Sequence, residues 1–312
     1  MAKAEVRAAY GDALKELGAV NSKVVALEAD VGASSKSGVF GAAFPERYFN
    51  VGIAELNMVA MAAGMATTGL IPFVNTFAVF LLLRGGDPVQ SMIAHDRLNV
   101  KLAGAYTGFS DSYDGSSHQA LTDISQARVL PNMTVLSVCD AVQCRKAVFE
   151  MAEFDGPVYI RLSRAATDVI YTDDSTFKIG GANKLIDGKD VTIFATGYMV
   201  QKSLEAAELL KADGINATVV DIYSIKPVDT ELVVACARET GAAVTVEEHN
   251  IYGGLGSVIC EELGKHYPIP VEMVGVQDVF GESGDYEKLL VKYGLCAENI
   301  AAKAKAAIAR KR

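Results

Sequence analysis

The sequence predicts an α/β protein made of two doubly wound domains. Short runs of β-branched residues alternate with Ala-, Leu- and Met-rich stretches of helical length along nearly the whole chain of 312 residues. Such alternation favours mostly parallel sheets that helices cover on both faces. The composition becomes more polar at residues 165–189, and the alternation then restarts. We therefore predict a first domain at residues 1–164, a linker at 165–189 and a smaller second domain at 190–312.

The first domain opens with a β-branched run that predicts a strand at residues 23–29. Further strands are expected at residues 99–105, 134–138 and 158–162. Helices are expected at residues 54–68, 77–83, 118–129 and 140–154. Gly69 marks the end of the first of these helices, and Asp140 is placed to act as the N-cap of the last.

The second domain repeats the pattern after the linker. Strands are expected at residues 191–195, 217–222, 243–247 and 271–274. Helices are expected at residues 199–212, 230–240 and 254–263, and an Ala-, Lys- and Arg-rich helix at 297–312. The glycines of Tyr252–Gly256 open the third of these helices, where tight turns and close packing explain them better than a phosphate-binding loop does.

The overall composition predicts a globular protein of the cytoplasm. Half of the residues are hydrophobic and 21% are charged, which is enough for a sizeable core. The net charge of −9 argues against nucleic acid and anionic membranes as partners. The longest apolar run, residues 69–83, is too short to span a bilayer, and the first residues lack an apolar signal region. Five cysteines without a CxxC pair indicate a reducing compartment and no metal site within this chain.

The segment from Tyr48 to Glu55 places one carboxylate between an apolar run and an apolar, Gly-, Ala- and Met-rich helix. A carboxylate in such surroundings should be shielded from water, and its hydrogen bonds should be strong. The alternative is that Glu55 acts only as a cap or dipole partner at the start of the helix. We take Glu55 as a candidate catalytic residue.

Phe77 and Phe80 are three residues apart and therefore share one face of the helix predicted there. They could form a wall that stacks on a planar heterocycle. The alternative is that both belong to the ordinary hydrophobic core.

The run Asp114-Gly115-Ser116-Ser117-His118 combines a turn with a candidate helix start. Asp-Gly favours a turn, and either serine could cap the helix predicted at 118–129. This would place His118 at a helix N-terminus, at the edge where open parallel sheets bind ligands. There it would suit hydrogen bonding or proton transfer near neutral pH, although a surface or capping histidine is the alternative.

Arg161 and Arg164 lie at the carboxyl end of the strand predicted at 158–162. An arginine at this edge of a parallel sheet can bind phosphate or carboxylate with two hydrogen bonds. The alternative is a surface salt bridge.

Taken together, these segments resemble the C-terminal half of a transketolase, an enzyme that depends on thiamin diphosphate. The resemblance covers essentially the whole chain, and the joint order of the motifs is specific although each motif is modest. In sequence order the motifs are Arg7, Glu28-Ala29-Asp30, FNVGIAE, NTFAVF, DGSSHQ, PNMTV, IRLSR, SIKPVD, EEHNIYGGLG and FGESGDY.

The resemblance implies a pyrimidine-binding first domain and a transketolase-type C-terminal domain. In this family a glutamate at the position of Glu55 hydrogen-bonds the aminopyrimidine ring of the cofactor and so activates it. Phe77 and Phe80 match the aromatic pocket for that ring. Asp30 and Ile53 match positions beside the cofactor.

The resemblance also implies the residues that bind the sugar substrate. Asp114 and His118 match residues that contact the hydroxyls around the carbon–carbon bond that breaks, and His118 would be catalytic. Arg7, Ser34 and Arg164 match positions that hold the phosphate of the sugar.

Two positions depart from the family pattern. Leu83 replaces a tyrosine that is common on the same helix face, and Tyr106 stands where many transketolases have a histidine. The second departure puts the usual pentose phosphate substrates in doubt, so the anion near Arg7 and Arg164 can be phosphate or another group such as a sulfonate.

The resemblance further implies a divided enzyme. Full-length transketolases bind the diphosphate and Mg²⁺ through a GDG motif followed by Asn in a preceding domain, and this sequence contains no such motif. We therefore expect the small, C-terminal subunit of a split transketolase. In such an enzyme Mg²⁺ is held by a large, N-terminal subunit, and two copies of each chain form an α2β2 assembly. The complex would transfer a two-carbon ketol unit from a ketose or its phosphate to an aldose or its phosphate.

Three other functions stay open at the level of the sequence. The β subunits of 2-oxo acid dehydrogenases share the two-domain plan and an equivalent glutamate, and deoxyxylulose-phosphate synthase is a second enzymatic alternative. The third alternative, from a different class, is a non-catalytic assembly subunit. The retention of Glu55, His118 and Arg164 together argues against that last interpretation.

Overall fold

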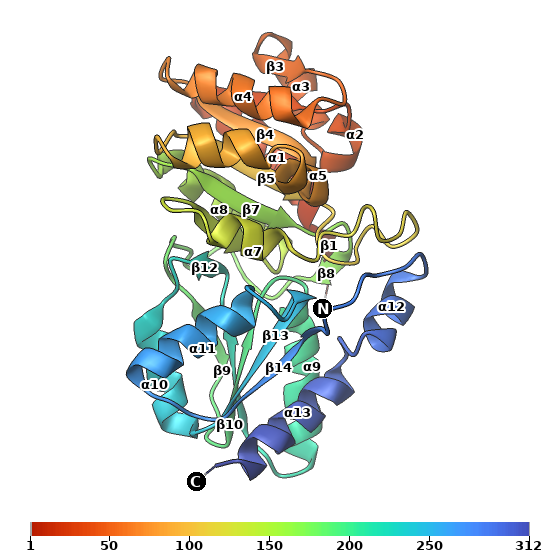
Figure 1. The fold of residues 1–312 in the computed structure, drawn as a ribbon, viewed down its shortest axis with the longest axis vertical. Coiled ribbons are helices and arrows are strands. Elements are labelled where there is room, and N and C mark those ends of the chain that lie inside the picture. Colours follow the sequence, from red (N-terminus) through yellow and green to blue (C-terminus); the bar gives the residue numbers. More distant parts are fainter. Residues whose placement is uncertain (1, 312) are drawn as a thin grey trace.

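The computed structural model describes residues 2–311, which form two α/β lobes stacked along the long axis of the molecule (Figure 1). The first lobe is built on a sheet with the strand order β12-β6-β7-β5-β4-β2-β3, in which all neighbours are parallel except β12 and β6. The strands are β2 (Val24–Glu28), β3 (Tyr48–Asn50), β4 (Ile71–Phe77), β5 (Lys101–Ala105), β6 (Thr134–Ser137), β7 (Val158–Leu162) and β12 (Ser224–Lys226).

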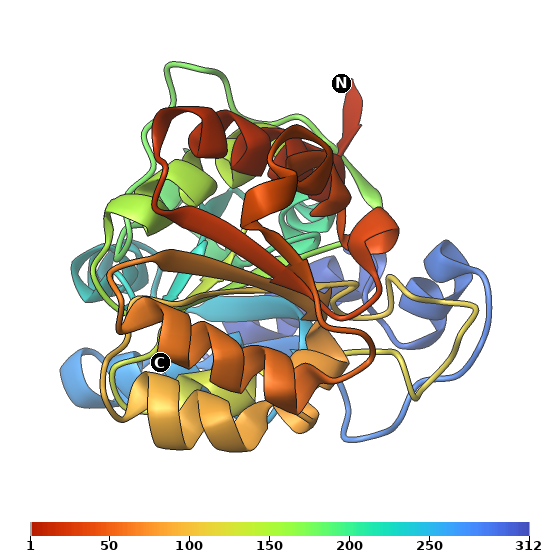
Figure 2. The same cartoon turned by 90° about the horizontal axis from the view of Figure 1, so that it is seen from above.

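Helices cover both faces of this sheet, which lies between them in Figure 2. One face carries α1 (Val6–Val20), α3 (Gly38–Ala43) and α8 (Ala141–Glu153). The other face carries α4 (Glu55–Ala66), α5 (Ala78–Leu83), α6 (Gly86–Pro88), the π-helical segment η2 (Val89–Ala94) and α7 (Asp123–Arg128). Every residue of β2, β5, β6 and β7 is buried, as a parallel strand covered on both faces requires, and most residues of β2 and β7 are apolar.

The second lobe has the same plan with fewer strands in the described part of the chain. Its order is β14-β13-β10-β11-β9, and only β9 runs antiparallel to its neighbour. The strands are β9 (Asn183–Ile186), β10 (Val191–Ala195), β11 (Ala217–Asp221), β13 (Ala243–Asn250) and β14 (Val271–Val276). One face packs against α9 (Met199–Ala212), α12 (Tyr286–Lys292) and α13 (Ala297–Ala309), and the other against α10 (Thr230–Thr240) and α11 (Leu255–His266). The predicted fold class is confirmed.

The central strand β4 was not predicted, because Pro72 and Asn75 interrupt its apolar run. In the folded protein the buried side chain of Asn75 has hydrogen-bond partners inside the core. The Asn75 amide donates hydrogen bonds to the carbonyls of Leu27 and Phe73, and its oxygen accepts one from the Tyr10 hydroxyl. Tertiary hydrogen bonds therefore stabilise a strand that local propensity disfavours.

The predicted helix 118–129 is wrong in its first turn, because α7 begins only at Asp123. Ala120 instead forms isolated β-bridges with Thr107 and Gly108, and its carbonyl accepts a hydrogen bond from the Gly108 amide at 3.0 Å. This pairing holds the segment after His118 extended. His118 therefore does not lie at a helix N-terminus, and neither Ser116 nor Ser117 caps a helix there. The predicted N-cap Asp140 is confirmed, since its carboxylate accepts a hydrogen bond from the Gln143 amide.

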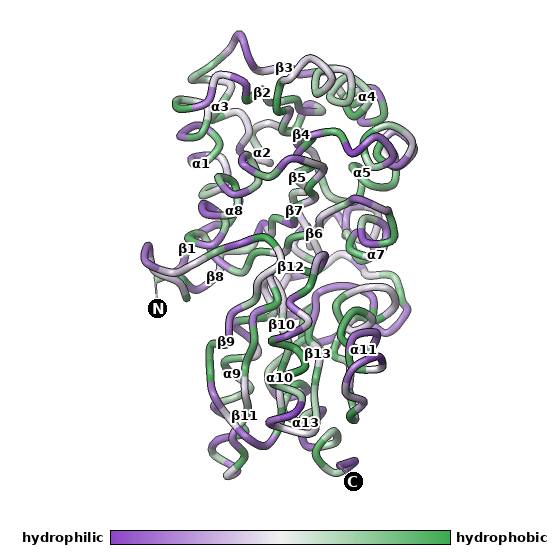
Figure 3. Tube along the Cα trace, turned by 90° about the vertical axis from the view of Figure 1, so that its left-hand side faces the viewer, coloured by the Kyte–Doolittle hydropathy of each residue, from purple (hydrophilic) through white to green (hydrophobic). Residues whose placement is uncertain are grey.

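The lobes are more closely joined than the linear order of predicted domains suggests. The segment predicted as a linker contains β8 (Ala166–Asp168), which pairs with β1 (Lys3–Glu5), and also contains β9. Strand β12 lies beyond this segment in the sequence but adds to the sheet of the first lobe. In Figure 3, β12 lies where the two lobes meet. None of the helices within residues 2–311 combines the length and apolar character that crossing a membrane requires.

A buried polar network joins the lobes. Arg161 Nε donates to Asp123 Oδ2 at 2.6 Å, and Arg161 Nη2 donates to the carbonyl of Glu248 in the second lobe at 3.1 Å. The Glu248 carboxylate accepts hydrogen bonds from the Phe109 amide at 2.6 Å and from the Tyr286 hydroxyl at 3.1 Å. The network therefore fixes the loop that follows β5 against the second lobe.

Glu248 should make the stability of the protein depend on pH. Burial raises the pKa of its carboxyl to about 7, well above the value of about 4.3 expected in the unfolded chain. The folded protein therefore binds this proton more tightly, and its contribution to stability is present below about pH 4 and is lost as the pH rises through 7. We expect Glu248→Gln to reduce the fall in unfolding free energy between pH 5 and pH 8, as measured by urea denaturation. An unchanged pH dependence would contradict this, since Asp221, whose pKa burial also raises to about 7, acts equally in both proteins.

Candidate functional site at the carboxyl edge of the first sheet

The predicted site residues gather where four adjacent strands of the first sheet end. Asp30 follows β2, Phe77 ends β4, Tyr106 follows β5 and Arg164 follows β7. The carboxyl edge of a parallel sheet is where α/β proteins bind ligands. The sequence brings these residues together because each lies within two positions of the end of a parallel strand.

Tyr106 lies at the centre of this edge in an unusual conformation. Its φ angle is 62°, in the left-handed region that only a few per cent of residues other than glycine adopt. Asp30, at the end of β2, has a φ angle of 60°. Such backbone strain costs on the order of 1–3 kcal/mol and concentrates at functional sites. Two strained residues at the same edge of the sheet therefore support a site there.

Phe77, Phe80 and His118 form an aromatic cluster beside Tyr106. The ring centroids of Phe77 and Tyr106 are 4.5 Å apart, and those of Phe77 and Phe80 are 5.9 Å apart. The His118 ring meets Phe80 edge-on at 5.1 Å, and its Nδ1 lies 3.0 Å from the Ser117 hydroxyl. His118 is half-buried. The loop after β5 thus brings the histidine to the aromatic pair by a route other than a helix N-terminus.

Glu55 is the first residue of α4, and only 4% of its surface is exposed. Its Oε1 lies 3.6 Å from Arg84 Nη1, and the Arg84 guanidinium lies 4.3 Å from the centroid of the Phe80 ring. Glu55 is therefore linked through Arg84 and Phe80 to His118. The preceding residue, Ala54, is the N-cap, so the structure gives Glu55 no capping role of its own.

Asp30 and Ile53 lie near the end of β3. The Asp30 carboxylate accepts a hydrogen bond from the Asn50 side chain at 3.1 Å, which ties the ends of β2 and β3 together. Ile53 is 74% exposed, two residues before the buried Glu55. Asp30 therefore lies at the same edge of the sheet as Phe77, and Ile53 lies two residues before the start of α4.

The arginines of the site converge on Tyr106. Arg7 Nη1 donates to the Tyr106 hydroxyl at 2.8 Å and to the carbonyl of Ser34 at 3.1 Å. The guanidinium carbons of Arg7 and Arg164 lie 5.4 Å and 5.2 Å from the centroid of the Tyr106 ring. Arg161 is instead buried against Asp123. The predicted arginine pair is thus divided: Arg164 reaches the edge of the sheet, and Arg161 serves the junction of the lobes.

Asp111 is a member of this group that the sequence did not point to. Its Oδ1 accepts a hydrogen bond from Arg164 Nη1 at 3.2 Å, and its side chain is 1% exposed. Burial and the neighbouring carboxylate of Asp114 raise the pKa of Asp111 to about 6. The contact spans 53 positions, so no local pattern in the sequence could reveal it.

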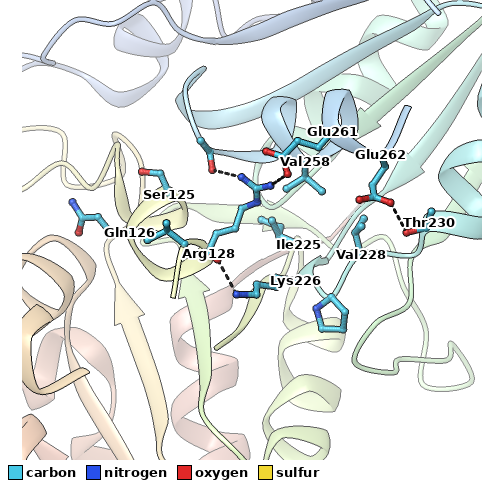
Figure 4. A pocket seen from close by; sticks show the side chains of 13 residues that line it. Ser125, Gln126, Arg128, Ile225, Lys226, Val228, Thr230, Val258, Glu261 and Glu262 are labelled. Carbon is cyan, nitrogen blue, oxygen red and sulfur yellow. Dashed lines mark hydrogen bonds and ion pairs between the residues drawn. The ribbon is translucent and has the colours of Figure 1, made fainter. Parts of the chain in front are cut away.

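A large pocket of about 840 Å³ lies elsewhere, between α7, β12 and α11 (Figure 4). Its charged groups are paired with one another, with the backbone or with a hydroxyl group. Arg128 pairs with Glu261, Glu262 accepts a hydrogen bond from the Thr230 hydroxyl, and Lys226 donates to the carbonyls of Arg128 and Leu130. None of the residues that line this pocket is aromatic, so it is a weaker candidate for a planar ligand than the edge of the sheet.

The edge of the sheet suits a planar heterocycle that carries hydrogen-bonding nitrogens. Phe77 and Phe80 offer aromatic surface, and Glu55 offers a carboxylate largely shielded from water. The pyrimidine ring of thiamin diphosphate has these properties, so the residues present fit that part of the cofactor. Among residues 2–311, no group of three or more His, Cys, Asp or Glu side chains is arranged to hold a metal ion.

Comparison with known proteins agrees with this geometry. Residues 2–169 match the family model of the transketolase pyrimidine binding domain, and residues 180–300 match that of the transketolase C-terminal domain. A 6-deoxy-6-sulfo-D-fructose transketolase subunit of Clostridium sp. (strain MSTE9) is 42% identical over 295 residues, which span 95% of this chain and 92% of that protein. A subunit of the apulose-4-phosphate transketolase of Phocaeicola vulgatus is 38% identical over 295 residues, which span 94% of each chain.

A solved structure described as "Split gene transketolase, inactive beta4 tetramer" superposes with a TM-score of 0.92. It is 48% identical in sequence, and the match covers 100% of both chains. The similarity therefore extends over both lobes.

Proposed function

The chain belongs to the transketolase family, and we propose that it is the small subunit of a split, thiamin diphosphate-dependent transketolase. The complex would transfer a two-carbon ketol unit from a ketose or its phosphate to an aldose or its phosphate. The observation that carries this proposal is the buried Glu55 carboxylate, which is linked through Arg84 and Phe80 to His118 at the ligand-binding edge of the sheet.

In this proposal the first lobe holds the pyrimidine ring of the cofactor. Thiamin diphosphate supplies the electron sink for the carbon–carbon bond cleavage, and the protein positions it. Glu55 would hold a proton at a ring nitrogen, while Phe77 and Phe80 would stack on the ring. Asp30 and Ile53 would border it.

The loop after β5 would hold the substrate. His118 and Asp114 would bind the sugar hydroxyls next to the bond that breaks, and His118 would move a proton at a sugar oxygen. Arg7 and Arg164 would receive the far end of the sugar. Ser34 would contribute by fixing Arg7 through its main-chain carbonyl.

The surface around Glu55 supports a partner chain. Ile53, Leu56 and Leu83 are 74%, 54% and 60% exposed, and Ile53 and Leu56 flank Glu55 on the chain. Leu83 precedes Arg84, which pairs with Glu55. Apolar residues gathered beside a buried polar group are typical of an interface. We propose that a large transketolase subunit covers this surface, binds the diphosphate and Mg²⁺, and forms an α2β2 assembly with this chain.

A two-carbon transfer assay tests the proposal. The purified chain, thiamin diphosphate and Mg²⁺ are mixed with ketose donors and an aldose acceptor, with and without a candidate large subunit. We expect transfer only when both chains are present. Transfer by this chain alone would contradict the need for a partner. Decarboxylation of 2-oxo acids without sugar transfer would favour a 2-oxo acid dehydrogenase instead.

A further inference from the structure

Both arginines at the proposed far end of the substrate already have carboxylate partners. Arg7 Nε lies 3.2 Å from the Glu5 carboxylate, and Arg164 Nη1 lies 3.2 Å from that of Asp111. The two carboxylates differ in their surroundings. Glu5 is 43% exposed, so water and salt screen its charge, whereas Asp111 is 1% exposed. Asp111 is therefore the carboxylate that would repel a bound anion more strongly.

The Asp111 carboxylate is poorly compensated within the protein. Its Oδ2 is buried and has no hydrogen-bond partner among residues 2–311. Asp114 lies close enough to raise the pKa of Asp111, so a second carboxylate acts on the same site. Because the pKa of Asp111 is about 6, the group is mostly ionised at pH 7.5. The charge of Arg164 is thus balanced by a carboxylate that is shielded from water.

Three of the five N–H donors of Arg7 already have partners within residues 2–311. Its Nε contacts Glu5, and its Nη1 donates to the Ser34 carbonyl and to the Tyr106 hydroxyl. The backbone of Tyr106 is in the left-handed conformation. The guanidinium groups of Arg7 and Arg164 both lie near its ring. The phenol therefore occupies one donor position that an anionic oxygen would otherwise take.

We propose that Asp111 is a specificity-determining residue, which makes this end of the site favour a ketose whose far end carries at most one negative charge over a phosphate dianion. This inference rests on the proposed transketolase function. A phosphate monoester carries about −1.5 to −2 charges near pH 7. Each added negative charge near a shielded carboxylate meets a repulsion that water screens less than at an exposed site. Asp111 acts through Arg164 and through its own charge, and it takes no part in the chemical step.

Three donors that share the fructose skeleton test this selectivity in the reconstituted complex. They are fructose, 6-deoxy-6-sulfofructose and fructose 6-phosphate, whose far ends are neutral, singly charged and close to doubly charged. We expect Asp111→Asn, which removes the charge and keeps an oxygen for Arg164, to raise kcat/KM for the phosphate relative to the sulfonate at least tenfold, mainly through KM. A purely structural role would change all three donors alike, so an unchanged ratio would overturn the proposal, as would a wild-type preference for the phosphate over the sulfonate.

A matched control is Glu16→Gln, which removes the same charge from an exposed ion pair with Arg145 on the outer surface of α1 and α8. The ratio should not change in this variant. If the complex transfers no ketol unit from any donor, the proposed function fails, and that failure is distinct from an unchanged ratio.

A second measurement needs no partner chain. Inorganic phosphate is titrated against the isolated full chain while thermal unfolding is followed. Asp111→Asn should lower the apparent dissociation constant for phosphate at least fivefold, and the double variant Asp111→Asn/Arg164→Gln should lose this gain. Equal phosphate binding by the wild type and Asp111→Asn would overturn the electrostatic role of Asp111, whatever reaction the complex catalyses.

Discussion

Replacing Glu55 with glutamine is expected to lower the rate of two-carbon transfer by the reconstituted complex by about a thousandfold, within the range for losing a positioned acid or base. Glutamine has nearly the same shape but cannot hold a transferable proton in the same way. Since Glu55 pairs with a half-exposed Arg84 and does not cap α4, its loss should leave the fold intact. The measurement is kcat in a steady-state transfer assay, together with the circular dichroism melting curve of the isolated chain.

A suitable control is Glu261→Gln, which applies the same chemical change to a glutamate that pairs with Arg128 beside the large pocket. This variant should transfer the ketol unit at close to the wild-type rate. If Glu55→Gln retained more than a tenth of the wild-type kcat, Glu55 would not be the residue that activates the cofactor.

The sequence predicts the two-lobed fold where local and tertiary preferences agree. β2 and β7 are buried along their whole length and consist mostly of apolar residues, so their local pattern predicts a strand. β4 was missed because Asn75 finds its partners on Leu27 and Tyr10, which lie far from it in the sequence. The start of α7 was misplaced for the same reason, since the bridge at Ala120 depends on a loop that precedes it.

The site shows the same division. Glu55, Phe77 and His118 lie in recognisable motifs. The structure brings the rings of Phe77 and His118 together. Asp111 and Arg84 could not be identified from the sequence, because their significance depends on contacts with residues distant in the chain. Their ion pairs determine the local charge, so the substrate preference is the property of this site that sequence motifs convey least.

Among the substitutions proposed here, the loss of Asp123, which forms a buried ion pair with Arg161, should lower the free energy of unfolding most. The side chains of Arg161 and Asp123 are 4% and 2% exposed. Replacing Asp123 with alanine would leave the Arg161 guanidinium in a buried position without its counter-charge. Removing one partner of such a pair typically costs about 3–5 kcal/mol. We therefore expect a loss of this size in the free energy of unfolding, measured by urea denaturation at pH 7.5.

Three further variants separate charge from packing. Asp123→Asn keeps an oxygen for the hydrogen bond of the Tyr159 hydroxyl and should lose less stability than Asp123→Ala. Glu16→Ala breaks an exposed pair with Arg145 and should change the unfolding free energy by less than about 1 kcal/mol. The double variant Asp123→Leu/Arg161→Met removes both charges and should recover most of the loss, because much of the penalty comes from the unpaired guanidinium.

The position of this pair predicts how the variant should unfold. Arg161 Nη2 also donates to the Glu248 carbonyl in the second lobe, so a guanidinium that shifts toward water would weaken the junction of the lobes. We therefore expect Asp123→Ala to unfold in two separate transitions, whose free energies are summed for the comparison above, and the wild type to unfold in one. A single transition with a loss below about 1 kcal/mol, the size typical of an exposed ion pair, would mean that this ion pair contributes little to holding the lobes together. The hydrogen bonds of Glu248 would then hold the loop that carries Asp111 and His118 without it.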